Sequence, residues 1–390
     1  MSIGPLRVGL VAGETSGDTL GAGLIEALRR RRPDAQFFGI AGPRMSAAGC
    51  ETWESAERLA VMGLFEILGS LPELLRLRRQ VRARLIAARP DVFVGIDAPE
   101  FNLGLAEGLK AAGLTTVQYV SPQVWAWRQG RVTRIAHAVD LVLCLLPFEQ
   151  QFYREHDMRA EFVGHPLADQ IPLVVDRAAA RARLGFPAAA APDARLIAVL
   201  PGSRRGEVER LGSDFAATVQ WLRERRPRFE FVAPMANATT RGIFSAALAR
   251  CAPSVPVQLT DGDAQVALAA SDAALVASGT ATLEATLTGR PMVVAYRLGA
   301  LTSFVMRRFG LMKAPYFAQP NLLAGRRIVP ELYGSAVTPA RLGTELLGLL
   351  DDPRRIAELE KEFAGIHIAL RRGASERAAE AVLALVEGRS

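Results

Sequence analysis

The sequence predicts an α/β fold with two domains, each built around a parallel β-sheet. Short apolar runs typical of buried strands alternate with stretches of helical periodicity in both halves of the chain. The chain has 390 residues, more than one hydrophobic core usually supports. A proline- and alanine-rich stretch at 168–195 is typical of a linker with one short helix at 177–184. We therefore expect domains over 1–170 and 190–350, followed by helices over 351–390 that close the second domain or pack back on the first.

Composition narrows the classes of protein to which the chain can belong. Hydrophobic residues make up 50% and charged residues 22% of the sequence, as in folded globular proteins. No window has the length of uncharged apolar residues that a transmembrane helix needs, and the N-terminus has no signal-peptide pattern. Three scattered cysteines without a CxxC spacing predict neither a disulfide framework nor a zinc site. The net charge of +7 suits a phosphorylated substrate, an anionic membrane surface or nucleic acid, and does not choose among them.

Strands and helices are expected to alternate along the whole chain. In the first domain we expect strands at 6–11, 36–40, 91–97, 115–119, 141–145 and 162–167. In the second domain we expect strands at 196–199, 229–233, 257–259, 273–277 and 292–295. Helices are expected between these strands, and alanine-rich charged helices are expected at 339–350, 353–370 and 375–386. This order predicts two parallel sheets with helices on their faces.

Asp97 stands at the carboxyl end of the buried run 91–97. Ligands of open α/β sheets bind outside the carboxyl ends of the strands, so a carboxylate there is a candidate general base. Aspartate also caps turns frequently, which is the alternative role for Asp97. His165, one of four histidines, is a second base candidate, although a hydrogen-bonding role within the fold is the interpretation that we favour.

Two further loops of the first domain carry candidate substrate contacts. Residues 12–18 include glycines without the spacing of a dinucleotide loop, and Glu14 and Asp18 would repel a phosphate. This loop holds a neutral or hydroxyl-bearing substrate, or is simply a tight turn. Trp125 and Trp127, two of only four tryptophans, can wall a sugar or lipid pocket, and a packed loop is the alternative.

The stretch from Val61 to Ala88 differs from its surroundings. It begins with a nearly apolar run at 61–68 and continues with five arginines interleaved with aliphatic residues. Because such patterns belong most often to ordinary core helices, we favour a core helix with a solvated basic face on the residues alone. The alternative is an apolar and basic surface that touches anionic lipid or an acyl chain.

In the second domain, the loop 200–207 carries Gly202, Ser203 and Arg204 where a strand is followed by a helix. Backbone N–H groups and the positive end of the helix dipole converge at such a place, and phosphate is a natural ligand. Glycine permits close approach of the backbone, serine can cap the helix, and arginine offers a planar fork to a diphosphate. A surface turn that happens to carry arginines is the alternative.

A second strand-to-helix loop contains Ser278, Gly279 and Thr280, and Glu284 follows one turn into the helix. The loop N–H groups can take a phosphate, while the carboxylate of Glu284 can accept hydrogen bonds from ribose hydroxyls. The same residues would also make an ordinary helix cap. Two phosphate-compatible loops in one domain favour a nucleoside diphosphate site.

Together these segments resemble the lipid-A-disaccharide synthase family, glycosyltransferases of the two-Rossmann-domain (GT-B) type. The matching segments run in the family's order over residues 12–332, so the resemblance covers nearly the whole chain. They are AGETSGD at 12–18, GIDAPEFN at 95–102, SPQVWAW at 121–127, GHP at 164–166, LPGSR at 200–204, SGTATLE at 278–284, PN at 320–321 and RRIVPEL at 326–332. The resemblance implies two Rossmann-like domains with the active site in the cleft between them.

The family's reaction transfers the sugar of UDP-2,3-diacylglucosamine to the 6-hydroxyl of 2,3-diacylglucosamine 1-phosphate, giving a β-1,6-linked disaccharide 1-phosphate and UDP. The resemblance implies inversion at the donor carbon, with Asp97 as the base. It implies that Glu284 binds the ribose and that the other UDP contacts come from Gly202, Ser203, Arg204, Ser278, Gly279, Thr280 and Asn321. It implies an acceptor pocket that includes Glu14, Ser16, Asp18, Asn102, Trp125, Trp127 and His165. No metal and no other cofactor is expected.

Lipid substrates change the interpretation of the basic stretch. We expect a peripheral enzyme on the cytoplasmic face of the inner membrane, contacting the lipid through about Val61 to Arg84. Rival GT-B enzymes that use UDP-sugars include a UDP-GlcNAc epimerase and the enzyme that builds the peptidoglycan lipid intermediate, and the segments around Asp97 and Trp125 argue against both. Nucleic acid is not expected as a partner, because the arginines are spread over several helices. The sequence leaves the oligomeric state open, with a homodimer as one alternative.

Overall fold

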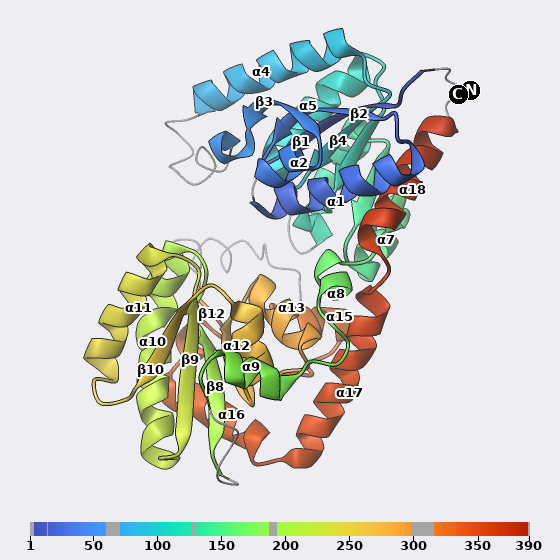
Figure 1. Cartoon of the computed structure of the whole chain (residues 1–390). Helices are drawn as coiled ribbons and strands as arrows, with labels where there is room; N and C mark the ends of the chain where they lie inside the picture. The colour runs from blue at the N-terminus through green and yellow to red at the C-terminus, as the bar shows by residue number, and fades with distance from the viewer. Residues whose placement is uncertain are drawn as a thin grey trace. The chain divides into compact units, whose positions relative to one another are not determined.

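The structure is a computed structural model, and it describes residues 4–13, 15–59, 71–125, 129–186, 193–297 and 316–388. The chain divides into two compact units. Unit 1 contains Met1–Asp169 and Leu370–Ser390, and unit 2 contains Gln170–Ala369. Each unit has a parallel β-sheet with helices packed on it, which confirms the predicted fold class (Figure 1).

Unit 1 contains a seven-stranded parallel sheet with the order β3-β2-β1-β4-β5-β6-β7. Its strands are β1 (Arg7–Ala12), β2 (Gln36–Ala41), β3 (Cys50–Ser55), β4 (Val92–Ile96), β5 (Thr116–Tyr119), β6 (Leu141–Cys144) and β7 (Ala160–Phe162). The fourth strand lies beside the first, so the loops after β1 and β4 leave the sheet in opposite directions. Such a switch point is where open α/β sheets bind their ligands.

Helices cover both faces of this sheet, because successive side chains of a strand point to opposite faces. Leu10 of β1 belongs to the core under one set of helices, and its neighbour Val11 belongs to the core under the other set. The first set is α1 (Thr15–Arg31), α2 (Pro43–Ala47) and α18 (Ala374–Glu387). The second set is α4 (Leu71–Ala88), α5 (Pro99–Ala111), α6 (Val132–Ala138) and α7 (Pro147–Arg154).

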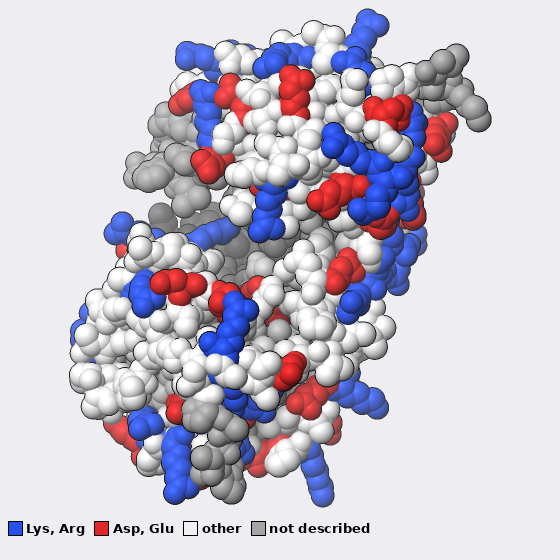
Figure 2. Space-filling view, viewed as in Figure 1, with Lys and Arg blue, Asp and Glu red and all other residues white. Residues whose placement is uncertain are grey.

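The last helix of the chain, α18, is part of unit 1. Its buried residues Ala378 and Val382 belong to the same core as those of α1. At the surface, Glu376 forms ion pairs with Arg30 and Arg31 of α1. Figure 2 shows acidic and basic side chains gathered where α1 and α18 lie together. Apolar burial and charge pairing therefore both hold α18 on α1.

Unit 2 contains a six-stranded parallel sheet with the order β10-β9-β8-β11-β12-β13, which repeats the switch point of unit 1 between β8 and β11. Its strands are β8 (Arg195–Leu200), β9 (Phe229–Met235), β10 (Val257–Asp261), β11 (Ala273–Ala277), β12 (Met292–Tyr296) and β13 (Glu331–Tyr333). Its helices are α9 (Arg177–Arg183), α10 (Arg205–Arg225), α11 (Ala238–Cys251), α12 (Ala264–Ala270), α13 (Thr280–Leu287), α15 (Gln319–Ala324), α16 (Pro339–Leu350) and α17 (Pro353–Leu370). The short helix α8 (Pro166–Gln170) ends where unit 2 begins.

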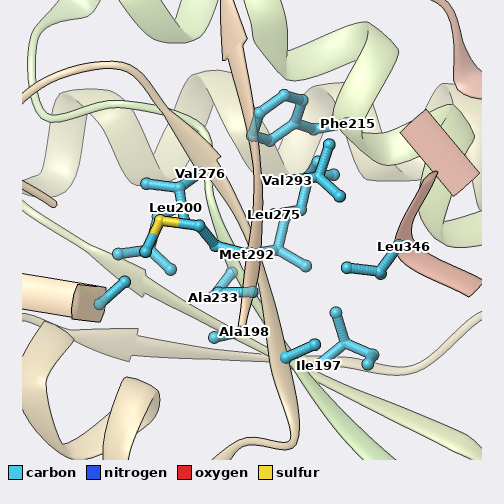
Figure 3. Packing of buried hydrophobic residues seen from close by; sticks show 14 of the residues in the cluster. Ile197, Ala198, Leu200, Phe215, Ala233, Leu275, Val276, Met292, Val293 and Leu346 are labelled. Atoms are coloured by element: carbon cyan, nitrogen blue, oxygen red, sulfur yellow. The ribbon is translucent and has the colours of Figure 1, made fainter. Parts of the chain in front are cut away.

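The core of unit 2 is one continuous apolar cluster around its sheet. Figure 3 shows Phe215 of α10 and Leu346 of α16 beside Leu275 and Val293 of the central strands. All four of these side chains have an exposed fraction of 1% or less. The strands are apolar on both faces, as expected for a parallel sheet that is covered by helices on each side.

The structure differs from the expected elements in a few places. β3 and β13 were not expected, since β3 is a partly exposed edge strand without an apolar run and β13 has only three residues. A strand was expected over 162–167, but β7 ends at Phe162 and α8 begins at Pro166. Gly164 between them has a φ of +95°, and proline cannot donate to a strand ladder.

The stretch expected as a linker contributes a buried ion-pair cluster to unit 2. Asp272, with 13% of its side chain exposed, accepts from Arg181 at 2.7 Å and from the backbone N–H of Leu196 at 2.7 Å. Arg177 also pairs with this carboxylate. Helix α9 is thereby fastened to the beginnings of β8 and β11.

Asp272→Asn should lower the free energy of unfolding of unit 2 by about 2–3 kcal/mol, because two arginines would lose their buried anion. Urea denaturation at neutral pH measures this loss. The matched control is Asp193→Asn, because Asp193 forms an exposed pair with Arg228 and its loss should leave the midpoint nearly unchanged. Equal midpoints for both variants would show that the Asp272 cluster does not stabilise the fold.

Candidate active site

Unit 2 contains a pocket of about 240 Å³ at its switch point, outside the carboxyl ends of β8 and β11. The pocket brings together most of the residues that the sequence predicted for the nucleotide: Gly202, Ser203, Arg204, Ser278, Gly279, Thr280 and Glu284. The end of β9 and the segments that follow β9 and β10 add Pro234, Met235, Ala236 and Gly262 to the lining. The two loops are far apart in sequence and meet because β8 and β11 are neighbours.

The loop after β8 is organised around Gly202 and Glu207. Gly202 has a φ of +131°, and a Cβ added there would lie 2.5 Å from the Cβ of Glu207. Glu207 Oε2 accepts hydrogen bonds from the N–H groups of Ser203 at 3.0 Å and Arg204 at 3.3 Å. These two amides are therefore already paired within the loop. What the loop offers to an anion is the exposed guanidinium of Arg204.

The second loop presents the N-terminus of α13. Gly279, with a φ of +152°, precedes the helix, and its carbonyl accepts from the N–H of Thr282 at 3.1 Å. The hydroxyl of Ser278 donates to the carbonyl of Phe317 at 2.9 Å and so fixes the loop from behind. The first N–H groups of a helix lack intrahelical acceptors and carry the positive end of its dipole. This end of α13 opens into the pocket at Gly279 and Thr280, which are exposed.

Glu284 lies one turn into α13 and lines the same pocket. Gln265 of α12 donates to its Oε1 at 3.5 Å, which leaves room for further donors. Burial raises the pKa of Glu284 above its usual value, and the hydrogen bond from Gln265 opposes this rise. An acceptor beside a cationic helix end matches the hydroxyl and phosphate groups of a nucleotide.

Asn321 does not line this pocket. It is fully buried, its Oδ1 accepts from the N–H groups of Ile328 at 2.7 Å and Val329 at 2.9 Å, and its amide donates to the carbonyl of Val329 at 3.0 Å. A side chain with this set of partners holds the backbone that leads into β13. The geometry therefore favours a positioning role for Asn321 over a direct contact with the nucleotide.

In unit 1, Asp97 occupies a strained corner at the end of β4. Asp97 has a φ of +54° and the next residue, Ala98, has a φ of +40°, which are left-handed values that cost free energy for residues with a Cβ. Two buried amide side chains hold this corner. Asn102 donates to the carbonyl of Asp97 at 2.9 Å, and Gln118 donates to the same oxygen at 3.1 Å.

The corner turns Asp97 into a pocket of about 280 Å³. Arg131 lines the pocket and makes a bidentate ion pair with Glu100, with N–O distances of 2.7 and 3.0 Å. The remaining wall comes from the loop after β5, at Val120, Ser121, Pro122, Gln123 and Val124. The hydroxyl of Ser16, from the start of α1, lies 3.5 Å from Asp97 Oδ2. The half-exposed carboxylate of Asp97 and the Arg131–Glu100 ion pair thus share one pocket, and the Ser16 hydroxyl lies beside the carboxylate.

The other residues predicted for the acceptor pocket have different surroundings. Asp18 is buried and accepts from the N–H groups of Arg44 and Met45 at 2.9 Å, so it caps α2. His165 Nδ1 accepts from the N–H of Leu167 at 3.2 Å, and burial lowers the pKa of His165 to about 4. This supports the hydrogen-bonding role favoured above.

Trp125 is half buried and does not line the pocket of Asp97. Its indole N–H donates instead to Glu149 at 3.2 Å. The predictions for Glu14 and Trp127 lie outside the described residues.

Several residues that line or support the two pockets were missed from the sequence. Gln118, Gln265 and Arg131 carry no motif, and each acts through a partner that lies 19 to 31 positions away. Of these three residues, only Gln118 could have been suspected of a role near the site, because it lies near the carboxyl end of a predicted strand. Among the described residues, no three His, Cys, Asp or Glu side chains come together in a way that could hold a metal ion. In the same part of the chain, no helix is long and apolar enough to cross a membrane.

Two parallel-sheet units, each with a switch point beside its first strand, place the protein in the GT-B fold class. UDP-GlcNAc 2-epimerase from Neisseria meningitidis bound to UDP-GlcNAc superposes with a TM-score of 0.63, covering 97% of this chain and 100% of that chain at 13% identity. The calicheamicin glycosyltransferase CalG4 superposes with a TM-score of 0.57, covering 99% of both chains at 17% identity. Identities this low establish the shared fold alone.

Sequence comparison identifies the family. The family model for lipid-A-disaccharide synthetase matches residues 8–385. A lipid-A-disaccharide synthase from Pseudomonas aeruginosa (strain UCBPP-PA14) is 56% identical over 384 residues, which cover 98% of this chain and 99% of the relative. The enzyme of the same name from Serratia proteamaculans (strain 568) is 51% identical over 383 residues, with 98% and 99% coverage. The chain therefore belongs to the lipid-A-disaccharide synthetase family, as the sequence motifs predicted.

Gly202→Ala should lower the affinity of unit 2 for UDP by about tenfold, because the new Cβ collides with Glu207 and displaces the loop that carries Arg204. Isothermal titration with UDP measures the change. Gly289→Ala is the matched control, since Gly289 also has a positive φ, of +68°, but meets nothing within 4 Å and does not line the pocket. An unchanged affinity in the Gly202 variant would show that UDP does not depend on this loop.

Proposed function

We propose that the protein transfers the sugar of UDP-2,3-diacylglucosamine to the 6-hydroxyl of 2,3-diacylglucosamine 1-phosphate, and that UDP is released. Membership of the family supports the formation of a lipid A disaccharide. The observation that carries the proposal is a carboxylate on a strained corner at one switch point and a phosphate- and ribose-compatible pocket at the other. A base and a nucleotide site are the two parts that this transfer requires.

Asp97 is proposed as the general base. Its carboxylate removes the proton of the acceptor 6-hydroxyl while that oxygen forms the new bond to C1 of the donor. The bond between C1 and the diphosphate breaks in the same displacement, so the α-linked donor gives a β-linked product and the electron pair leaves with UDP. The amides of Asn102 and Gln118 hold the Asp97 backbone and so aim the carboxylate at one place.

The leaving diphosphate is proposed to lie between Arg204 and the N-terminus of α13. Negative charge grows on this group as the C1–O bond breaks, and a fixed guanidinium and helix dipole stabilise it. Glu284 is proposed to accept hydrogen bonds from the ribose hydroxyls. No metal is required in this arrangement, because the cationic groups come from the protein.

We also propose peripheral binding to the cytoplasmic face of the inner membrane through the stretch from Val61 to Arg84. Its first part, 61–70, lies outside the described residues. In α4, Leu77, Val81 and Leu85 are buried against the sheet. Of the arginines between them, Arg78 is half-buried against Gly104 of α5, and the other three are exposed. A basic face of this kind attracts anionic headgroups.

Asp97→Asn should lower kcat by about 100-fold or more, because the amide cannot take the acceptor proton. UDP affinity should be unchanged. The measurement is UDP release with the acylated donor and acylated acceptor together. Glu107→Gln on α5 is the control, since this exposed carboxylate faces Arg134 and lies outside the pocket. Full activity in the Asp97 variant would place the base elsewhere, and no release by the wild type would argue against the substrate pair.

Glu284→Gln should weaken UDP binding by about tenfold, because hydrogen bonds to an ionised acceptor are stronger than those to a neutral amide. The raised pKa of Glu284 also gives a sign to the pH dependence. Protonation of Glu284 removes its charge as the pH falls, so UDP affinity should decrease toward acid pH more steeply in the wild type than in the variant. Titration calorimetry at several pH values checks both points, with the exposed Glu209→Gln as control. Parallel pH curves would count against the ribose contact.

A further inference from the structure

Glu149 is a buried carboxyl group that the proposed chemistry does not use. It lies in the first turn of α7, directly after β6, and only 4% of it is exposed. Its Oε1 accepts from the indole N–H of Trp125 at 3.2 Å, and its Oε2 accepts from the backbone N–H of Leu146 at 3.1 Å. One carboxylate therefore ties together the segments that follow two neighbouring strands, β5 and β6.

The segment after β5 is also a wall of the Asp97 pocket. Trp125 ends the short 3-10 helix Gln123–Trp125, whose first two residues line that pocket. Helix α7 supports this wall at two further points. The hydroxyl of Tyr153 hydrogen-bonds with that of Ser121 at 3.1 Å, and the ring of Phe148 packs edge-on against Trp125 with centroids 4.7 Å apart.

The hydrogen-bonding partners of Glu149 suit its ionised form. A carboxylate only accepts, and Glu149 faces the N–H groups of Trp125, Leu146 and Leu145, whereas a protonated carboxyl would turn an O–H toward one of these donors. Burial raises the pKa of Glu149 to about 7, against the opposing effect of hydrogen bonds from Leu146, Trp125, Leu145 and Ser121. The described titratable groups that face it are Cys144 of β6 and Tyr153 of α7. Burial raises the pKa of both, so Glu149 is the group of this cluster that changes charge near neutral pH.

We propose that Glu149 is a positioning residue whose carboxylate holds Trp125 and the Ser121–Val124 wall in the shape that receives the hydroxyl-bearing acceptor beside Asp97. Protonation of Glu149 breaks one of its N–H contacts and loosens that wall. The inference rests on the proposed function for the identity of the acceptor. The contacts of Glu149 with Trp125 and Leu146 do not depend on it.

Glu149→Gln tests the inference, because the amide has the same shape as the protonated acid and puts an NH₂ group against one of the donors. At about pH 8 the variant should show an acceptor KM raised by about tenfold, with UDP affinity unchanged, since one hydrogen bond to a charged acceptor is lost. The wild-type kcat/KM for the acceptor should rise from about pH 6 to about pH 8, around the pKa of about 7, while the variant lacks this rise. The matched control is Glu155→Gln, which changes an exposed carboxyl at the end of the same helix and should keep the wild-type profile.

A second measurement does not need the Glu149 variant. Wild-type tryptophan fluorescence should shift with a midpoint near the pKa of about 7, because the indole of Trp125 gains or loses its acceptor. Trp125→Phe should remove this transition and also raise the acceptor KM. The inference would be overturned if Glu149→Gln kept the acceptor KM and the pH profile of kcat/KM of the wild type. It would also be overturned if the wild type showed no fluorescence transition. A fluorescence transition without transfer of the acylated sugar would support the role of Glu149 in the wall and overturn the proposed function instead.

Discussion

The arrangement of both sheets depends on one constraint, the pairing of the fourth strand with the first. In each unit the chain builds three strands outward and then returns to pair on the other side of the first strand. Loops after the first and fourth strands must leave in opposite directions, so they part at the carboxyl edge and leave room for a ligand. Asp97 stands at this place in unit 1, and the loops of Gly202 and Gly279 stand there in unit 2.

Polar side chains hold the backbone at both of these sheet edges. Left-handed conformations at Asp97 and Ala98 are unfavourable, and the amides of Asn102 and Gln118 supply two hydrogen bonds that hold them. In unit 2, the half-buried Glu207 holds the loop at Gly202 by accepting from two backbone N–H groups. The residues that line the two pockets are thus held in place by hydrogen bonds with neighbouring side chains.

Most of the fold and part of the site could be predicted from the sequence, for identifiable reasons. Apolar runs and helical spacing are local patterns, and they predicted the central strands and the loops of Asp97, Arg204 and Thr280. Edge strands such as β3 have one solvated face and few apolar residues, so they leave a weak pattern. The motif that contains Asn321 was recognised, but its buried contacts with residues 328–329 could not be seen in a motif.

The sequence by itself determined the alternation of strands and helices, the family, and the residue types at the ends of the strands. Only the tertiary structure decided which of these side chains face a pocket and which form hydrogen bonds within the fold. Asp18 caps a neighbouring helix, and Glu149 accepts an indole N–H from the segment after another strand. The physical reason is that a buried polar group must find its partner wherever packing brings one, and sheet pairing brings together residues that are distant in the chain.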